Sequence, residues 1–371
     1  MKNLLMLLNG LFLLSCSNGQ TQIAETGLKS TQIQTSEEQT ELIYEKTKSF
    51  PENTQLSIAI IDKGKVKFIG IKRVNDSIIQ IENHRSAFEI GSISKIFTST
   101  LLANFVVNNR LKLENNIQDF VDFDLKTNES ITFKQLANHT SGLPRLPSNL
   151  NLMLADPSNP YKDYDEEKLK SYLKEKIKLN QAPGTKYEYS NLGAGLLGYL
   201  LKEISTTNYN KLLEEIVFSK YGMSSSSADR SKLKSELVKG LDSNGKETAN
   251  WDFNVLVGAG GILSTVEDLT KFSLAQFEQE NAELQLTHQP TFKLSETMEI
   301  GLGWLIIKAS DGNNEVIWHN GGTGGYTSSM ALDLNNKNGI IILSNVSAFN
   351  KDMGEIDNLC FGLIKAMWKE N

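Results

Sequence analysis

Short apolar stretches near both ends of the chain have the pattern of strands, and the residues between them have a helical period. Near the amino-terminal end, the stretches 56–61 and 66–71 are rich in β-branched residues. The residues 62–65 between them are mostly polar and include a glycine, so the sequence predicts a β-hairpin. After Gly91, apolar residues recur every three or four positions, which predicts a buried helix that begins at Ser92.

The rest of the chain completes a mixed fold. From about 111 to 299 it has helical stretches, the clearest at 167–178 and 192–204, broken by loops that contain proline and glycine. Further strands are expected at 302–307, 316–319, 326–332 and 340–344, followed by a helix at 352–369. We therefore predict an α+β fold in which an antiparallel sheet, built from both termini, is flanked by helices and carries a large helical insertion. An active site is expected in the cleft between sheet and insertion.

The first sixteen residues have the pattern of an export signal. Lys2 precedes an apolar run at 4–14, which is shorter than the ~20 residues that a membrane-spanning helix needs. Residues 13–16, Leu-Leu-Ser-Cys, resemble the lipobox of bacterial lipoproteins, in which the cysteine is acylated and becomes the first mature residue. We expect an exported protein of the bacterial cell envelope, anchored in a membrane through a lipid on Cys16. A plain secretory signal is the alternative.

The signal is followed by a tether and then by the folded domain. Residues 17–40 are rich in Ser, Thr, Gln and Asn, which predicts a flexible tether. The domain is expected at 41–371, with its sheet region at about 41–90 and 300–371 and its helical region at about 91–299.

Composition excludes several classes of function. Of the 371 residues, 39% are hydrophobic and 22% are charged, a balance typical of a globular chain. The formal net charge of −6 and the lack of any block of Lys and Arg disfavour a nucleic-acid partner. Besides Cys16 the chain has only Cys360, so no disulfide framework is expected. The four histidines lack the spacing of metal ligands, and we expect neither a metal nor another cofactor.

Ser92 and Lys95 form a Ser-x-x-Lys pattern on the predicted helix. Residues i and i+3 share one face of a helix, so the Lys95 amine can reach the Ser92 hydroxyl. The same pattern occurs at Ser171, Ser231 and Ser243, where polar surroundings indicate exposed surface. Ser92 differs because it opens an apolar helix, where burial lowers a lysine pKa as a lysine base requires. The start of a helix also directs N–H groups toward a developing oxyanion.

Two further motifs are candidates for the same cleft. In Tyr189-Ser190-Asn191 a phenol could exchange protons and a carboxamide could hold a substrate carbonyl, although Asn191 could also cap the next helix. The segment 319–325, His-Asn-Gly-Gly-Thr-Gly-Gly, lies between two strand-like stretches. Its glycines would let an edge strand approach a substrate, and one of their N–H groups could complete an oxyanion hole with that of Ser92. A plain glycine-rich hairpin loop is the alternative.

Together these motifs resemble a known family. Residues 88–95, Phe-Glu-Ile-Gly-Ser-Ile-Ser-Lys, are similar to the active-site signature of class C β-lactamases and related penicillin-binding proteins. Tyr189-Ser190-Asn191 matches the family's Tyr-x-Asn, and His319-Asn320-Gly321 stands where the family has Lys-Thr-Gly or His-x-Gly. Supporting similarity occurs at 131–144, 260–265 and 301–304. The resemblance covers the chain from about residue 41 to its end.

The resemblance implies a β-lactamase/transpeptidase-like fold and a two-step acyl transfer. Ser92 would attack a carbonyl, Lys95 or Tyr189 would take its proton, and water would then cleave the acyl-enzyme. The oxyanion would lie between the amides of Ser92 and Gly322. The other implied substrate-binding residues are Asn191, His319 and Gly321. The expected substrate is a β-lactam or a D-amino-acid peptide amide, for example from peptidoglycan.

His319 departs from the lysine that many relatives have, and it opens alternatives. A lysine there pairs with a substrate carboxylate, whereas a neutral imidazole does so less well. This favours a second hypothesis, an esterase for small esters on the same fold. A third is a penicillin-binding or sensor lipoprotein that is acylated and deacylates slowly. His139 is expected to support a loop, because no Gly-x-Ser-x-Gly motif occurs that would indicate a triad.

Overall fold

The computed structural model describes residues 36–75, 77–151, 155–309 and 312–369. The predicted export signal, Cys16 and most of the predicted tether lie outside these residues.

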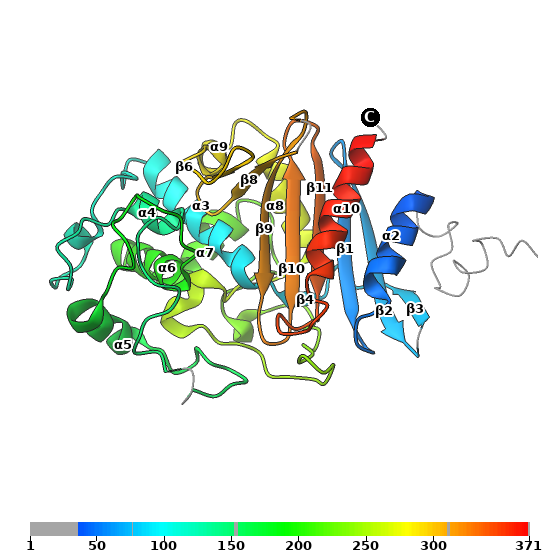
Figure 1. The fold of residues 1–371 in the computed structure, drawn as a ribbon, viewed down its shortest axis with the longest axis horizontal. Coiled ribbons are helices and arrows are strands. Elements are labelled where there is room, and N and C mark those ends of the chain that lie inside the picture. The colour runs from blue at the N-terminus through cyan, green and yellow to red at the C-terminus, as the bar shows by residue number, and fades with distance from the viewer. Residues whose placement is uncertain (1–35, 76, 152–154, 310–311, 370–371) are drawn as a thin grey trace, which may run out of the picture.

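A large antiparallel sheet forms the centre of the molecule (Figure 1). Within the described residues it has nine strands, in the order β3-β2-β1-β11-β10-β9-β8-β7-β6. The strands are β1 (Gln55–Asp62), β2 (Lys65–Val74), β3 (Ser77–Ile81), β6 (Phe292–Lys293), β7 (Met298–Ile300), β8 (Leu305–Lys308), β9 (Glu315–Gly322), β10 (Thr327–Asp333) and β11 (Asn338–Ser344). β1 pairs antiparallel with β11, with Leu56 opposite Ser344, so the two ends of the domain meet in the middle of the sheet. The predicted antiparallel sheet built from both termini is confirmed.

The predicted hairpin is formed by β1 and β2, which pair with Asp62 opposite Lys65. Between them Lys63 and Gly64 have φ angles of 48° and 80°. Two successive residues with positive φ give the turn whose twist matches that of paired strands. The local sequence therefore sets this end of the sheet.

Helices cover both faces of the sheet. They are α2 (Glu37–Thr47), α3 (Ser94–Val107), α4 (Phe133–Ala137), α5 (Glu166–Ser171), α6 (Asn191–Ser205), α7 (Tyr209–Leu213), α8 (Val266–Gln276), α9 (Ala282–His288) and α10 (Glu355–Lys369). In Figure 1, α2 and α10 lie in front of the strands, α8 lies behind them, and α3 to α7 form the helical part on the left. A small second sheet pairs β4 (Ala87–Glu89) with β5 (Leu263–Thr265). None of the described helices is long and apolar enough to cross a bilayer.

Two apolar clusters lie on opposite faces of the sheet. On β1, Ile58 and Ile60 belong to the cluster under α2 and α10, whereas Ala59 and Ile61 belong to the cluster shared with the helical part. Successive side chains of a strand point to opposite faces, so a strand buried on both sides is apolar throughout. This is why residues 56–61 are all apolar apart from Ser57.

Several boundaries differ from the sequence predictions. The first described helix begins at Glu37, inside the predicted tether, because Ser36 and Gln39 form a reciprocal capping box. The short strands β3, β6 and β7 were not predicted. The predicted helix at Ser92 opens with a 3₁₀ turn, η1 (Gly91–Ile93), before α3. Residues 319–322 belong to strand β9 and not to a loop.

Candidate active site

Ser92 lies in η1, where the chain passes from β4 into α3. Gly91 has a φ of 51°, a conformation that favours glycine, and it lets the chain turn between the two elements. The carbonyl of Ile90 accepts a hydrogen bond from Ser328 Oγ on β10 (2.9 Å). The turn that carries Ser92 is thus fixed to the central sheet.

The Lys95 amine has three oxygen neighbours. Its Nζ lies 3.0 Å from Ser92 Oγ, 2.9 Å from Asn191 Oδ1 and 2.6 Å from the carbonyl oxygen of Ala259. The side chain is buried, 2% exposed. Burial, and secondarily the Arg145 guanidinium, hold the pKa of Lys95 well below its usual range. This is the dry setting that the sequence predicted for a lysine base.

Tyr189 supplies a second polar contact to the serine. Its hydroxyl donates to Ser92 Oγ at 2.5 Å, although the two residues are 97 positions apart. Burial raises the pKa of the Tyr189 phenol above its usual range. The phenol therefore stays protonated near neutral pH.

The start of α6 orders the Tyr189-Ser190-Asn191 motif. Ser190 is the N-cap residue, and its Oγ accepts from Gly193 N at 2.8 Å. The alternative in which Asn191 caps this helix is thus wrong. Asn191 is the first residue of α6, and its Nδ2 donates to Tyr161 Oη at 3.4 Å.

Gly321 and Gly322 allow β9 to touch the turn that carries Ser92. A Cβ on Gly321 would lie 2.0 Å from the Ile90 carbonyl oxygen and 2.9 Å from Ser92 N. A Cβ on Gly91 would lie 2.5 Å from Gly322 N. Only glycines permit this approach, and it brings the amides of Ser92 and Gly322 to one junction.

His319 is buried and neutral. Its Nδ1–H donates to the carbonyl oxygen of Asn320 at 2.6 Å, which leaves Nε2 without a proton in the neutral ring. Burial, reinforced by the nearby Lys95, lowers the pKa of His319 to about 3. The neutral form of the imidazole, expected from the sequence, is thus favoured more strongly than in a free histidine. His319 supplies no cation near neutral pH.

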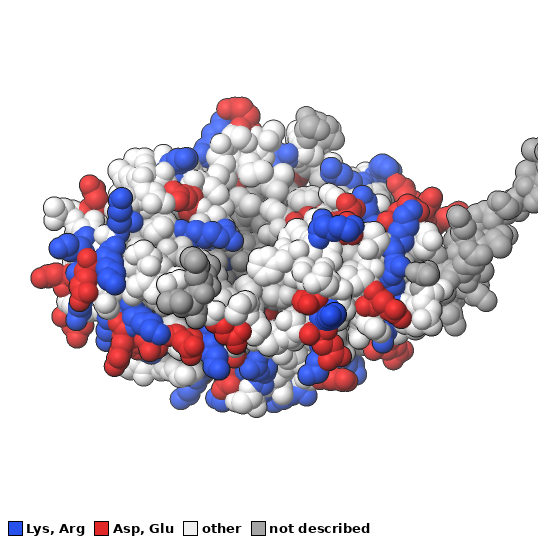
Figure 2. All heavy atoms as spheres, turned by 60° about the horizontal axis from the view of Figure 1, so that its bottom comes forward, with Lys and Arg blue, Asp and Glu red and all other residues white. Residues whose placement is uncertain are grey.

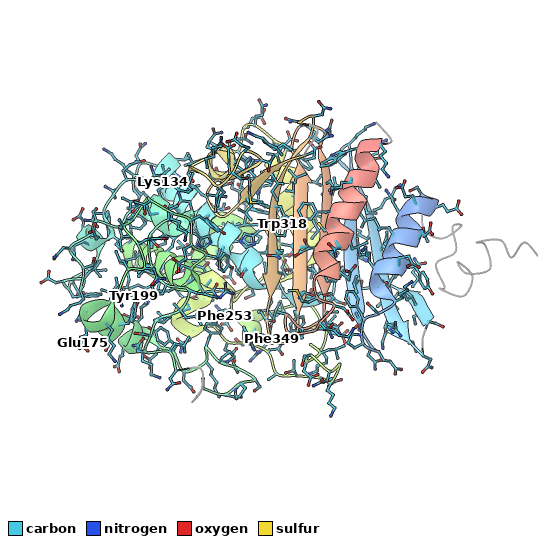
Figure 3. All side chains as sticks on the ribbon, viewed as in Figure 1. Lys134, Glu175, Tyr199, Phe253, Trp318 and Phe349 are labelled. Atoms are coloured by element: carbon cyan, nitrogen blue, oxygen red, sulfur yellow. The ribbon has the colours of Figure 1, made fainter. Side chains whose placement is uncertain are left out.

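Ser92 opens into a cleft of about 660 Å³, which Tyr189, Asn191, Gly321 and Gly322 also line. One wall is aromatic, made of Tyr161, Trp251, Phe253 and Phe349. Figure 3 places Phe253 and Phe349 below the end of β9, whereas Trp318 lies higher on that strand. Figure 2, which brings this lower side forward, shows a hollow near the middle with few charged side chains in it. The cleft thus combines a polar serine centre with an apolar wall.

The residues 51–359 match the family described as Beta-lactamase. The chain belongs to this family. It is 27% identical over 263 residues to a beta-lactamase of Pseudomonas fluorescens, covering 67% of this chain and 68% of that protein. It is 23% identical over 309 residues to Protein flp of Staphylococcus aureus (strain N315), covering 79% of this chain and 59% of that protein. The alignment therefore spans about three fifths of the staphylococcal protein.

Two solved structures share the fold of this chain. An octameric penicillin-binding protein homologue from Pyrococcus abyssi has a TM-score of 0.73 at 21% identity, over 89% of this chain and 77% of that chain. A class C beta-lactamase from Rhodobacter sphaeroides has a TM-score of 0.71 at 17% identity, over 90% and 100%. The predicted β-lactamase/transpeptidase-like fold is confirmed.

Several residues at this beta-lactamase-family site were not found from the sequence. Ala259 contributes only a backbone carbonyl, which leaves no side-chain signal. Arg145 lines the cleft and lies with its guanidinium carbon 5.0 Å from the Tyr189 ring centroid. Glu89 is buried, and it accepts from Trp251 N at 2.9 Å, which holds part of the aromatic wall.

His139 has the supporting position that the sequence predicted. Its Nδ1 accepts from Ser190 N at 3.2 Å, and its ring centroid lies 4.7 Å from that of Tyr189. It therefore fixes the loop that presents Tyr189. The described residues contain no cluster of three or more His, Cys, Asp or Glu able to hold a metal ion.

Proposed function

We propose that the chain is a serine hydrolase that cleaves a β-lactam or a D-amino-acid peptide amide, such as one from peptidoglycan, through an acyl-enzyme on Ser92. The observation that carries the proposal is the position of Ser92 Oγ, 3.0 Å from Lys95 Nζ and 2.5 Å from the Tyr189 hydroxyl in an open cleft. A nucleophile with a base and a proton donor in hydrogen-bond reach is the arrangement that acyl transfer needs.

Lys95 is the better candidate for the base. A neutral amine donates two hydrogen bonds, here to Asn191 Oδ1 and Ala259 O, and its lone pair then faces the Ser92 hydroxyl. As Ser92 Oγ bonds to the substrate carbonyl carbon, its proton passes to Lys95. The raised pKa of Tyr189 argues against a phenolate in this role.

The remaining steps use the other groups of the site. The oxyanion would accept from the amides of Ser92 and Gly322, which meet at the junction of η1 and β9. When the carbonyl re-forms, the bond to the leaving nitrogen breaks and the nitrogen takes the hydroxyl proton of Tyr189, which regains a proton from the Lys95 ammonium. Water then attacks the ester carbon and gives a proton to Lys95. The bond between that carbon and Ser92 Oγ breaks, Lys95 returns the proton to Oγ, and the free acid leaves.

A second candidate is an esterase acting on small esters. His319 is held neutral, so it offers a substrate carboxylate no charge, and the aromatic wall of Trp251, Phe253 and Phe349 suits an apolar acyl or alkoxy group. Both features favour uncharged esters. A slowly deacylating, penicillin-binding or sensor protein would use the same first step.

The test uses soluble protein that starts at Ser17, with a chromogenic cephalosporin and a short-chain nitrophenyl ester as substrates. Opening of the cephalosporin that is lost in Ser92→Ala supports the first proposal. Cleavage of the ester alone moves the assignment to an esterase. A stable adduct on Ser92 in intact mass spectra, without turnover, supports the slowly deacylating alternative. A Ser92→Ala protein as active as the wild type would refute all three.

We also propose that the protein is held in the cell envelope by a lipid on Cys16. The lipobox-like residues 13–16 support this. Cells that express the full chain and are fed an alkynyl fatty acid should label the wild type and not Cys16→Ser. Equal labelling of both proteins would contradict acylation of Cys16 and favour the interpretation of residues 1–16 as a plain secretory signal.

A further inference from the structure

The cleft has little positive charge where a substrate would bind. Lys95 is buried with a lowered pKa, and its amine is engaged with protein oxygens. His319 is neutral. Arg145 is the only lysine or arginine among the described residues that line the cleft.

Arg145 is firmly placed beside the reacting groups. Its carbonyl oxygen accepts the N–H groups of Asn191 (3.0 Å) and Leu192 (3.1 Å) at the start of α6. The neighbouring Pro144 carbonyl accepts from Ser190 Oγ at 2.7 Å. The backbone at Arg145 is thus tied to the segment that carries Tyr189.

The Arg145 side chain itself is exposed and available. Its guanidinium lies over the Tyr189 ring, 5.0 Å from the centroid, and no ion pair joins it to a carboxylate of the described residues. By contrast, Arg85 pairs with Glu267 and Arg230 pairs with Asp252. A guanidinium presents a planar set of N–H donors that matches a carboxylate in a two-point contact.

We propose that Arg145 binds a carboxylate of the substrate and so selects anionic amides or esters over neutral ones. The inference rests on the proposed serine hydrolase function. Arg145 takes over the carboxylate pairing that His319 cannot perform. The carboxylate belongs either to the acyl part of the substrate or to its leaving group. Both parts adjoin the carbonyl that Ser92 attacks, and Arg145 lies beside Tyr189, which contacts Ser92.

Two pairs of esters distinguish these positions. In the first, 4-nitrophenyl hydrogen glutarate carries its charge on the acyl part, and 4-nitrophenyl valerate is the neutral match. In the second, 3-acetoxybenzoate carries its charge on the leaving group, and methyl 3-acetoxybenzoate is the neutral match. For each pair the readout is the ratio of kcat/KM for the anionic ester to that for the neutral ester.

We expect Arg145→Gln to lower this ratio at least tenfold in one of the two pairs, mainly through a higher KM for the anionic ester, and Arg145→Lys to restore part of it. Arg110→Gln is the matched control, because Arg110 also lies over an aromatic ring, that of Phe105, and does not line the cleft. Its ratio should equal that of the wild type. Added salt should depress the wild-type ratio and leave that of Arg145→Gln nearly constant.

Ratios in Arg145→Gln within twofold of the wild type for both pairs would overturn the inference, even if all rates fell. Arg145 would then affect the reaction only through its contact with the Tyr189 ring and its effect on the pKa of Lys95. Binding of 3-carboxyphenylboronic acid and phenylboronic acid, which bond to a serine hydroxyl without turnover, gives a second measurement. If none of the esters is hydrolysed, the esterase alternative fails, while the cephalosporin assay and the adduct on Ser92 still test the proposed acyl transfer. The ratio of the two boronate Kd values in wild type and Arg145→Gln then decides the role of Arg145.

Discussion

Alanine at Gly321 should separate β9 from the turn that carries Ser92. The added Cβ would lie 2.0 Å from the Ile90 carbonyl oxygen, 2.5 Å from Ser328 Oγ and 2.9 Å from Ser92 N. Ser328 can rotate away, but the other two atoms are backbone. Since non-bonded carbon and oxygen atoms need more than 3 Å, the backbone must move by about 1 Å.

The expected cost follows from that displacement. Moving Ile90 strains the bonds that its carbonyl accepts from Ser328 Oγ and Ile93 N. Overpacking of this kind costs about 1–3 kcal/mol of unfolding free energy. A displacement of about 1 Å between the amides that flank the oxyanion should lower kcat/KM about 100-fold.

Ester hydrolysis and thermal unfolding measure the two effects, with Gly354→Ala as the control. A Cβ on Gly354 would meet no atom within 4 Å, so this variant should match the wild type in both measurements. Rates are compared well below the melting temperature of Gly321→Ala, so that loss of folded protein does not count as loss of activity. Wild-type kcat/KM in Gly321→Ala would refute the idea that the contact between β9 and η1 builds the oxyanion site.

Three further predictions concern groups around Ser92. Tyr189→Phe removes a hydroxyl 2.5 Å from Ser92 Oγ and should lower kcat by about 10²–10⁴-fold in the ester assay, with Tyr187→Phe as the control. The pKa of Lys95 is lowered and that of Tyr189 is raised. We therefore expect kcat/KM to fall at acidic pH, where Lys95 takes up a proton, and to stay level up to about pH 9. A rate that climbs toward pH 10 would instead indicate a phenolate base. Burial raises the pKa of Glu89 from 4.5 to about 6, so the folded state binds a proton on Glu89 more tightly than the unfolded state does. The free energy of unfolding should therefore increase by about 2 kcal/mol as the pH falls from above 6 to below 4.5. Glu89→Gln should lose this pH dependence in urea unfolding, and an unchanged dependence would assign it to other groups.

The features that local sequence determines were predicted well. The β1–β2 hairpin follows from two β-rich runs and a turn with a glycine, and the contact between Ser92 and Lys95 follows from helical spacing. The strands β10 and β11 were each placed within one or two residues, and β11 in particular is marked by the apolar run 340–343. In contrast, β6 and β7 have only two and three residues, too few to show a period, and their pairing partners define them.

Contacts between distant residues could not be predicted from the local pattern. Nothing in the spacing of Ser92 and Tyr189 indicates that their oxygens meet, and only the family resemblance suggested it. Arg145 directly follows the stretch 131–144 that resembles the family and is not part of it, and its importance depends on the position of residue 145 beside the start of α6. The dry setting of Lys95 was predicted from its apolar helix, whereas the low pKa of His319 depends on burial and on Lys95, which is distant in the sequence.

Burial also explains why few side chains near Ser92 could recognise the charge of an anionic substrate. Lys95, His139 and His319 are all basic and all close to Tyr189, yet burial lowers the pKa of each of them. In the proposed mechanism a dry centre keeps Lys95 competent as a base, and it also prevents the neighbouring histidines from attracting an anion. If the substrate is an anion, as we propose, the charge that recognises it must come from a solvated side chain, and Arg145 is exposed and lines the cleft. The proposal thus gives catalytic basicity and recognition of a carboxylate to different residues, and it predicts that substitutions at Arg145 change the choice of substrate more than the chemistry.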